Sequence, residues 1–101
     1  MVNAACTIVW TTPAQLHIRQ AYEHICADSA KNAFKVLEDI IAAINKASVN
    51  LTMHAPDKYR LNNDGTYRAF TKHHYRVSYR VTKNIIRVLR VRHTSRKPKI
   101  Y

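Results

Sequence analysis

The spacing of apolar residues changes once along this 101-residue chain, and the change limits the fold to helices followed by strands. Between residues 14 and 47 apolar side chains recur every three to four residues, which is the period of an α-helix with one buried face. Between residues 67 and 93 apolar and polar residues largely alternate, which is the period of a half-buried β-strand. A single domain covering residues 1–101 is expected at this length.

Capping residues divide the helical part into two helices. Thr12, which a proline follows, is the expected N-cap of the first helix, and this helix runs to about residue 26. Asp28 or Ser29 can cap the second helix. The apolar stripe of the second helix contains Ala30, Ala33, Phe34, Leu37, Ile40, Ile41, Ile44 and Ala47. Because only about three residues join the helices, they form a hairpin over about residues 13–47.

Four strands are expected to form one mainly antiparallel sheet. Their predicted ranges are Thr7–Trp10, Tyr67–Thr71, Tyr75–Val81 and Ile85–His93. Short turns at residues 72–74 and 82–84 join the last three strands into a meander over about residues 67–93. The helical hairpin needs a surface to cover its apolar face, so we expect it to pack on one face of this sheet. The predicted fold class is therefore α+β.

Positive charge is concentrated in the part of the chain that forms the sheet. Residues 1–57 hold four Lys/Arg and five acidic residues, whereas residues 58–101 hold thirteen Lys/Arg and one acidic residue. So many like charges repel one another in a small folded domain. A positive surface of this kind indicates a polyanion partner, most often nucleic acid.

The arginines of the last two strands are expected on the sheet face opposite to the helices. This outward set contains Arg76, Arg80, Arg90 and Arg92. In the last strand Leu89 and Val91 should point toward the helices. The sequence does not decide which sheet face Arg68 occupies, because the apolar Phe70 lies on the same face of the strand. Guanidinium groups suit phosphate recognition, although a solvated charged face is the simpler alternative.

A basic tail, residues 94–101, follows the last strand and can reach back over the outward face. The tail and strand end bring together His93, Arg96, Lys97, Lys99 and Tyr101. RNA cleavage without a metal needs proton transfer and stabilisation of a charged phosphorane. A His, or a Tyr whose pKa is lowered by cations, could transfer the proton, and Arg or Lys could stabilise the charge. A packing role for the same His and Tyr is the alternative.

Other classes of site are not indicated. His73 and His74 are adjacent at a turn and make a poor chelating pair, so neither a metal nor a cofactor is expected. No apolar stretch approaches the roughly 18–20 residues of a membrane span. The first residues lack the pattern of a signal peptide, so a cytoplasmic location is expected.

Three segments carry a resemblance to a known family. They are Asp64–Phe70 (DGTYRAF), His74–Val81 (HYRVSYRV) and Ile86–Arg96 (IRVLRVRHTSR). Together with the Trp10-Thr-x-Pro segment and the order of elements, they resemble toxins of the RelE/ParE superfamily of bacterial type II toxin–antitoxin modules. The resemblance covers roughly residues 7–101. It implies a partner antitoxin, with an acidic segment, that wraps the toxin and covers its basic surface.

The resemblance implies two possible targets. RelE-like members cut mRNA in the ribosomal A site without a metal, and ParE-like members poison DNA gyrase. By position Arg76 corresponds to an active-site arginine of the nuclease members, and Tyr101 falls near the tyrosine of RelE. The His-x-x-Arg that often follows the last strand in ParE-like members fits His93 and Arg96 equally well.

The first hypothesis is ribosome-dependent mRNA cleavage. Its catalytic set is Arg76, Arg92, His93, Arg96 and Tyr101. The nucleic-acid-binding set is Arg68, Arg80, Arg90, Lys97 and Lys99. The alternatives are a ParE-like inhibitor of DNA gyrase with no catalysis of its own, and an inactive basic nucleic-acid-binding module.

Overall fold

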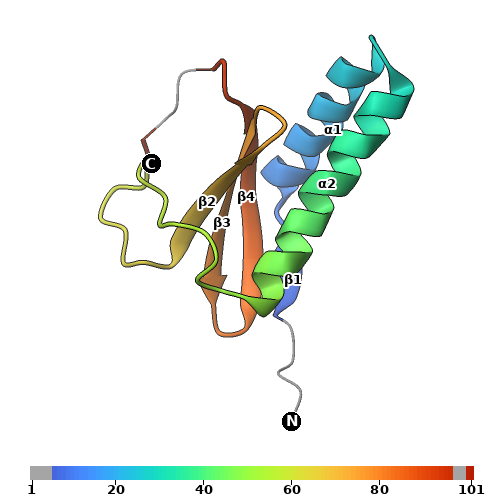
Figure 1. The fold of residues 1–101 in the computed structure, drawn as a ribbon. Helices are drawn as coiled ribbons and strands as arrows, with labels where there is room; N and C mark the ends of the chain where they lie inside the picture. The colour runs from blue at the N-terminus through green and yellow to red at the C-terminus, as the bar shows by residue number, and fades with distance from the viewer. Residues whose placement is uncertain (1–5, 97–99) are drawn as a thin grey trace.

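Two helices cover one face of a four-stranded sheet in the computed structural model, which describes residues 6–96, 100 and 101 (Figure 1). The elements are β1 Thr7–Trp10, α1 Thr12–Cys26, α2 Ala30–Val49, β2 Tyr67–Lys72, β3 Tyr75–Thr82 and β4 Ile85–His93. The strand order is β1-β4-β3-β2, in which β1 runs parallel to β4 and the other neighbours are antiparallel. The predicted α+β fold is confirmed. Within the described ranges no helix has the length and apolarity that a membrane crossing needs.

Side-chain caps begin both helices. Thr11 is the N-cap of α1, and its Oγ1 accepts a hydrogen bond from the Ala14 N–H at 3.4 Å. The same hydroxyl donates to the Val88 carbonyl of β4 at 2.7 Å. The predicted N-cap, Thr12, is wrong by one residue, because the hydrogen bond to the sheet fixes Thr11 at the start of the helix. Ser29 caps α2 as predicted, accepting from a backbone N–H of the first turn at 3.1 Å.

The two β-hairpins turn through pairs of residues in the left-handed region. The pairs are His73 with His74 (φ 48° and 67°) and Lys83 with Asn84 (φ 45° and 62°). Two consecutive residues with positive φ match the twist of the flanking strands, so each connection needs only two residues. As a result β2 and β3 are each one residue longer than predicted. His73 also contacts Asp39 of α2 at 2.5 Å, which ties the first turn to the helical layer.

The core lies between the helices and the inner face of the sheet. Its completely buried residues include Ala14, Ile40, Ala47, Val77, Tyr79, Ile86 and Val88. The predicted inward alternation along β3 is confirmed. In α2 the buried stripe runs through Val36, Ile40 and Ile44. Phe34 and Ile41, which we predicted in that stripe, stay 57% and 40% exposed because they lie at its margin.

A β-bulge in β4 decides which face its residues take. Arg90 pairs with Ser78, while Val88 pairs with the next residue of β3, so Leu89 is an extra residue between them. The alternation restarts after the bulge, and Val88 and Val91 are therefore both buried against the helices. The prediction for Val91 is confirmed. The prediction that Leu89 also points inward is wrong, because a strict two-residue alternation allows no bulge.

Replacement of two neighbouring isoleucines tests the orientation of α2. Ile40 is completely buried, so Ile40→Ala should lower the free energy of unfolding by about 2–5 kcal/mol. Ile41→Ala, the matched control on the exposed margin, should cost less than about 1 kcal/mol. Urea unfolding followed by circular dichroism measures both. Equal losses for the two variants would contradict the assigned buried face.

Candidate functional site

The sheet face turned away from the helices carries arginines that lie opposite one another. Arg76 pairs across the strands with Arg92, and Arg80 pairs with Arg87. Arg90 lies on the same face. The four predicted outward arginines are therefore all here, and Arg87 joins them because the bulge shifts the alternation of β4. Like charges directly opposite one another repel, so this face favours compensation by anionic groups.

Arg68 does not share this surface. It pairs with Tyr79, whose side chain is completely buried on the helix side of the sheet. Its Nη1 donates to the His54 carbonyl at 2.6 Å. Arg68 thus follows Phe70 to the inner face and braces the loop after α2, so it is separated from Arg80.

A buried carboxylate, Asp57, compensates part of the charge of the outward face. It comes from the loop between α2 and β2, and its side chain has no exposed surface. Arg76 Nη2 donates to Asp57 Oδ1 at 2.7 Å, and the Tyr101 hydroxyl donates to Oδ2 at 2.6 Å. The Tyr59 backbone N–H donates to Oδ1 at 3.0 Å. Asp57 therefore joins the loop, the sheet and the C-terminal segment at one point.

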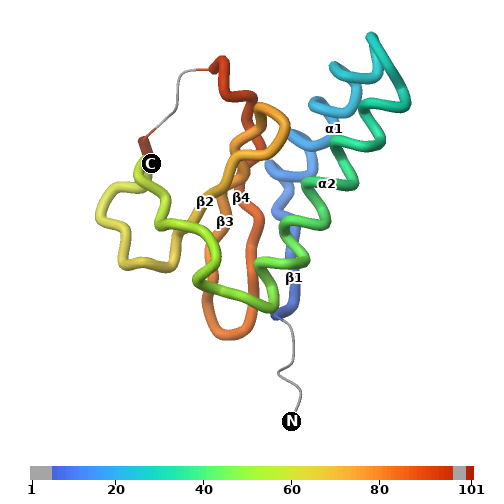
Figure 2. Tube along the Cα trace, viewed as in Figure 1, coloured from blue at the N-terminus to red at the C-terminus, as the bar shows by residue number. Residues whose placement is uncertain are grey.

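Tyr101 lies against this loop with both its backbone and its ring. Its N–H donates to the Tyr59 carbonyl at 2.9 Å, and its carbonyl accepts from the Leu61 N–H at 2.5 Å. The guanidinium groups of Arg90 and Arg60 lie 4.2 Å and 5.1 Å from the centroid of its ring. Figure 2 shows the result, with the C-terminal residue beside the 50–66 loop and across the sheet from the two helices.

These contacts set the protonation states of the two acidic groups. Burial by itself would raise the pKa of Asp57, but hydrogen bonds from Tyr101, Arg76 and the Tyr59 N–H hold that pKa below its ordinary value. Burial, followed by the hydrogen bond to Asp57, raises the pKa of the Tyr101 hydroxyl to about 12. At neutral pH the cluster is therefore a carboxylate held by one guanidinium and one neutral phenol.

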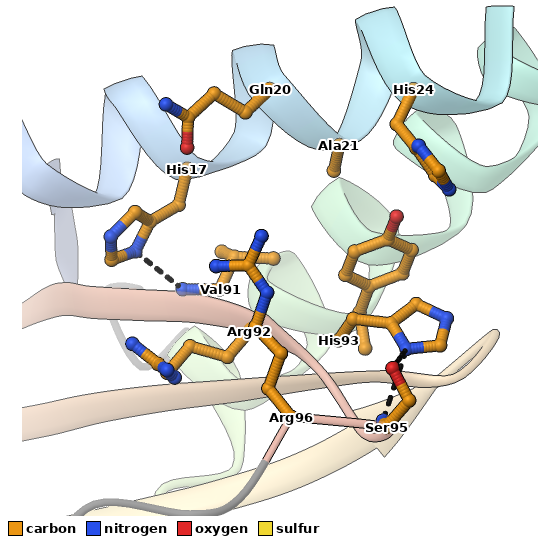
Figure 3. A pocket seen from close by; sticks show the side chains of 10 residues that line it. His17, Gln20, Ala21, His24, Val91, Arg92, His93, Ser95 and Arg96 are labelled. Atoms are coloured by element: carbon orange, nitrogen blue, oxygen red, sulfur yellow. Dashed lines mark hydrogen bonds between the residues drawn. The ribbon is translucent and has the colours of Figure 1, made fainter.

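Of the other predicted catalytic residues, His93 and Arg96 lie beside a cavity at the end of the sheet, and Arg92 of the outward face reaches this cavity as well. A cavity of about 300 Å³ between α1 and the end of β4 is lined in part by Arg92, His93 and Arg96 (Figure 3). A much smaller space of about 20 Å³ on the outward face lies beside Arg76 and Tyr101, and Arg92 lines it too. The structure therefore divides the predicted catalytic set into two groups that share only Arg92.

Some site residues were missed, and others lie beyond what the structure describes. Lys97 and Lys99, predicted to bind nucleic acid, lie outside the described residues. Asp57 was missed, because its only sequence signal was a turn-forming Pro-Asp pair far from β3. His17 carried no readable signal, and it reaches the cavity only through the packing of α1 on β4. In residues 6–96, 100 and 101 no three His, Cys, Asp or Glu side chains are grouped to hold a metal ion.

Comparison with known proteins gives consistent matches. The family model described as ParE toxin of type II toxin–antitoxin system, parDE, matches residues 8–98. The chromosomal ParDE toxin–antitoxin system from P. aeruginosa superimposes with a TM-score of 0.69 at 20% identity, over 88% of this chain and 96% of that one. The RelBE2 toxin–antitoxin complex from Mycobacterium tuberculosis superimposes with a TM-score of 0.55 at 21% identity, over 91% and 94%. No curated protein matches the sequence. At these identities the two structures establish a shared fold.

Removal of the buried charge tests the Asp57 cluster. Asp57→Asn leaves Arg76 without its counter-ion and should lower the free energy of unfolding at pH 7 by about 1–3 kcal/mol. The control Asp64→Asn removes an acid whose side chain is 59% exposed and should lower the free energy of unfolding much less.

The pH dependence of that loss follows from the pKa of Asp57. A carboxyl group whose pKa is lower in the folded state stabilises the fold above its unfolded pKa, near 3.9, and loses this contribution as pH falls through its folded pKa. The difference between wild type and Asp57→Asn should therefore be full above about pH 5 and shrink below about pH 4. Urea unfolding at pH 3–7 measures it. A difference that grows on acidification would contradict the cluster.

Proposed function

The chain belongs to the ParE toxin family of type II toxin–antitoxin systems, and we propose that it stops growth by binding DNA gyrase rather than by cutting RNA. Its role as a toxin follows from the family model, which spans residues 8–98. The choice of target is the proposal. It rests on the geometry around Asp57, and on the resemblance to ParE-like members, which poison gyrase without catalysis of their own.

The state of Tyr101 is the observation that carries this choice. A general base works best when its pKa lies near the working pH. With a pKa of about 12, roughly one Tyr101 hydroxyl in 10⁵ is ionised at pH 7. Its proton is directed at Asp57, and the charge of Arg76 is compensated by the same carboxylate. Both residues that correspond to nuclease positions therefore hold the C-terminal segment in place, which supports a binding role for this face.

The remaining arginines of the outward face supply the binding charge. Among the described residues Arg87, Arg90 and Arg92 make no ion pair with a carboxylate, in contrast to Arg76 and Arg80. They are half-buried on a rigid sheet, so little side-chain entropy is lost when they bind. Acidic side chains of gyrase, or phosphates of the DNA it holds, are the groups that such a surface recognises. A target in the cell's DNA machinery also implies action in the cytoplasm.

An antitoxin is the second partner that we infer. Both matched structures are of toxin–antitoxin systems. In this chain apolar side chains stay exposed along α2 and the loop that follows, among them Phe34, Val49 and Met53 at 57%, 70% and 45%. A partner with an apolar segment for this strip and a separate acidic segment for the basic surface would cover both.

Ribosome-dependent mRNA cleavage is the second candidate function. It is favoured by one observation, that His93, Arg92 and Arg96 line a common cavity. In that case His93 would take the proton-transfer role and Tyr101 would have no part in the chemistry. An inactive basic module is the third candidate, which harmless induction without antitoxin would support.

Gyrase supercoiling with purified toxin tests the proposed function. Wild type should inhibit supercoiling, and Arg92→Gln should raise the concentration needed by about tenfold, which is the usual effect of losing one well-placed charge. Lys31→Gln, which removes a charge from α2, should change it less than about twofold. Tyr101→Phe should keep inhibition within about threefold, because the phenol takes no part in chemistry.

Primer extension on translated mRNA is the companion experiment. The proposal expects intact mRNA while the toxin arrests growth. Cuts in the ribosomal A site that disappear in His93→Gln, together with unaffected gyrase at saturating toxin, would replace the gyrase proposal with the nuclease candidate.

A further inference from the structure

The cavity between α1 and the end of β4 has a lining of which the proposed gyrase interaction uses only Arg92. Its volume is about 300 Å³, within the range of pockets that hold small ligands. Figure 3 shows side chains reaching it from two sides. His17 and Gln20 come from α1, while Arg92, His93, Ser95 and Arg96 come from β4 and the residues that follow.

The lining offers cations and hydrogen-bond donors but no anion. In the part of the chain that the structure describes, neither Asp nor Glu lines the cavity, and Arg92 and Arg96 form no ion pair there. Both arginines line this space, and an anion bound there would relieve the repulsion between their like charges. The composition of the lining therefore selects an anionic ligand.

Hydrogen bonds to the backbone fix which ring nitrogen carries the proton in two histidines of the lining. His17 Nδ1 accepts from the Val91 N–H at 3.2 Å, and His93 Nδ1 accepts from the Ser95 N–H at 3.0 Å. A neutral imidazole carries one N–H, so in each ring the proton must sit on Nε2. Burial, and then the nearby arginines, lower the pKa of His17, which keeps this ring neutral at pH 7. Each ring thus has one N–H to donate even without a positive charge.

We propose that this cavity is a binding site for a phosphate group. A phosphate presents three or four acceptor oxygens, and the arginines that line the cavity can donate to several of them. The planar fork of an arginine pairs with two of those oxygens at once. The remaining volume has room for a sugar or a base beside the phosphate. The mRNA-cleavage candidate would use the same cavity, so a site that prefers RNA would support that candidate, whereas a site that prefers a nucleotide goes beyond both candidate functions.

The outward face is a poorer place for the same group. The space there is only about 20 Å³, and Tyr101 lines it. The Asp57 carboxylate also lies within that cluster and repels an anion. Of the two spaces that Arg92 lines, only the one beside α1 combines room, positive charge and the absence of a carboxylate.

The phosphate could belong to a nucleotide or to a nucleic-acid chain, and titration calorimetry separates these sources. The full chain in 0.15 M NaCl is titrated with inorganic phosphate, with adenosine monophosphate and with a six-nucleotide RNA. We expect saturable binding of one phosphate per chain, and chemical-shift changes of the His17 and His93 imidazoles in NMR spectra. A nucleotide that binds tighter than the RNA identifies a small-molecule site, and the reverse order identifies a backbone site.

Two charge-removing variants provide the control. Arg96→Gln should weaken phosphate binding about tenfold, because it removes a charge-assisted pair. Arg87→Gln removes the same charge from the outward face and should change binding less than twofold. Arg96 is exposed, so the fold should be retained, which circular dichroism verifies.

Three results would overturn the proposal. They are the absence of saturable phosphate binding, equal weakening by Arg96→Gln and Arg87→Gln, and tighter binding of a hexaglutamate peptide than of phosphate or RNA. The second would show that only overall charge matters. The third would assign the cavity to an acidic protein segment.

Discussion

The buried carboxylate of Asp57 is the interaction on which the rest of the basic surface depends. Removing a carboxylate from water costs several kcal/mol unless its oxygens are compensated. Here Arg76, Tyr101 and the Tyr59 N–H donate to it together. Asp57 thus links the loop before β2 to the sheet. Together with the backbone hydrogen bonds of Tyr101 to Tyr59 and Leu61, it holds the C-terminal residue against the loop.

As a result, the arginines of the outward face differ in whether a carboxylate compensates their charge. Arg76 is paired with Asp57, whereas Arg90 and Arg92 make no ion pair with a carboxylate among the described residues. The sheet end then offers two different environments, an outward face occupied by Tyr101 and a cavity beside α1 with no carboxylate in its described lining. The two proposals place a macromolecular target on the outward face and a phosphate in the cavity, and Arg92 lines both spaces.

Much of the fold follows from the period of the apolar residues. The helices, the strands and the inward side of β3 were predictable because burial repeats locally along each element. The bulge at Leu89, the cap at Thr11 and the inward turn of Arg68 were not, since each depends on a contact with another element. The site was less predictable still. Its arginines could be placed on a face, but Asp57 and His17 approach it only through tertiary packing.

Titration of the Tyr101 hydroxyl is the most direct test of this account. Carbon-13 NMR of protein labelled at the tyrosine ζ carbon follows each phenol, and Tyr101→Phe assigns the signal. The account predicts that Tyr101 stays protonated through pH 11, in line with a pKa of about 12, and that Asp57→Asn brings its pKa down toward the ordinary value near 10. A Tyr101 pKa at or below 10 in the wild type would contradict it, because the phenol would then be available as a catalytic base.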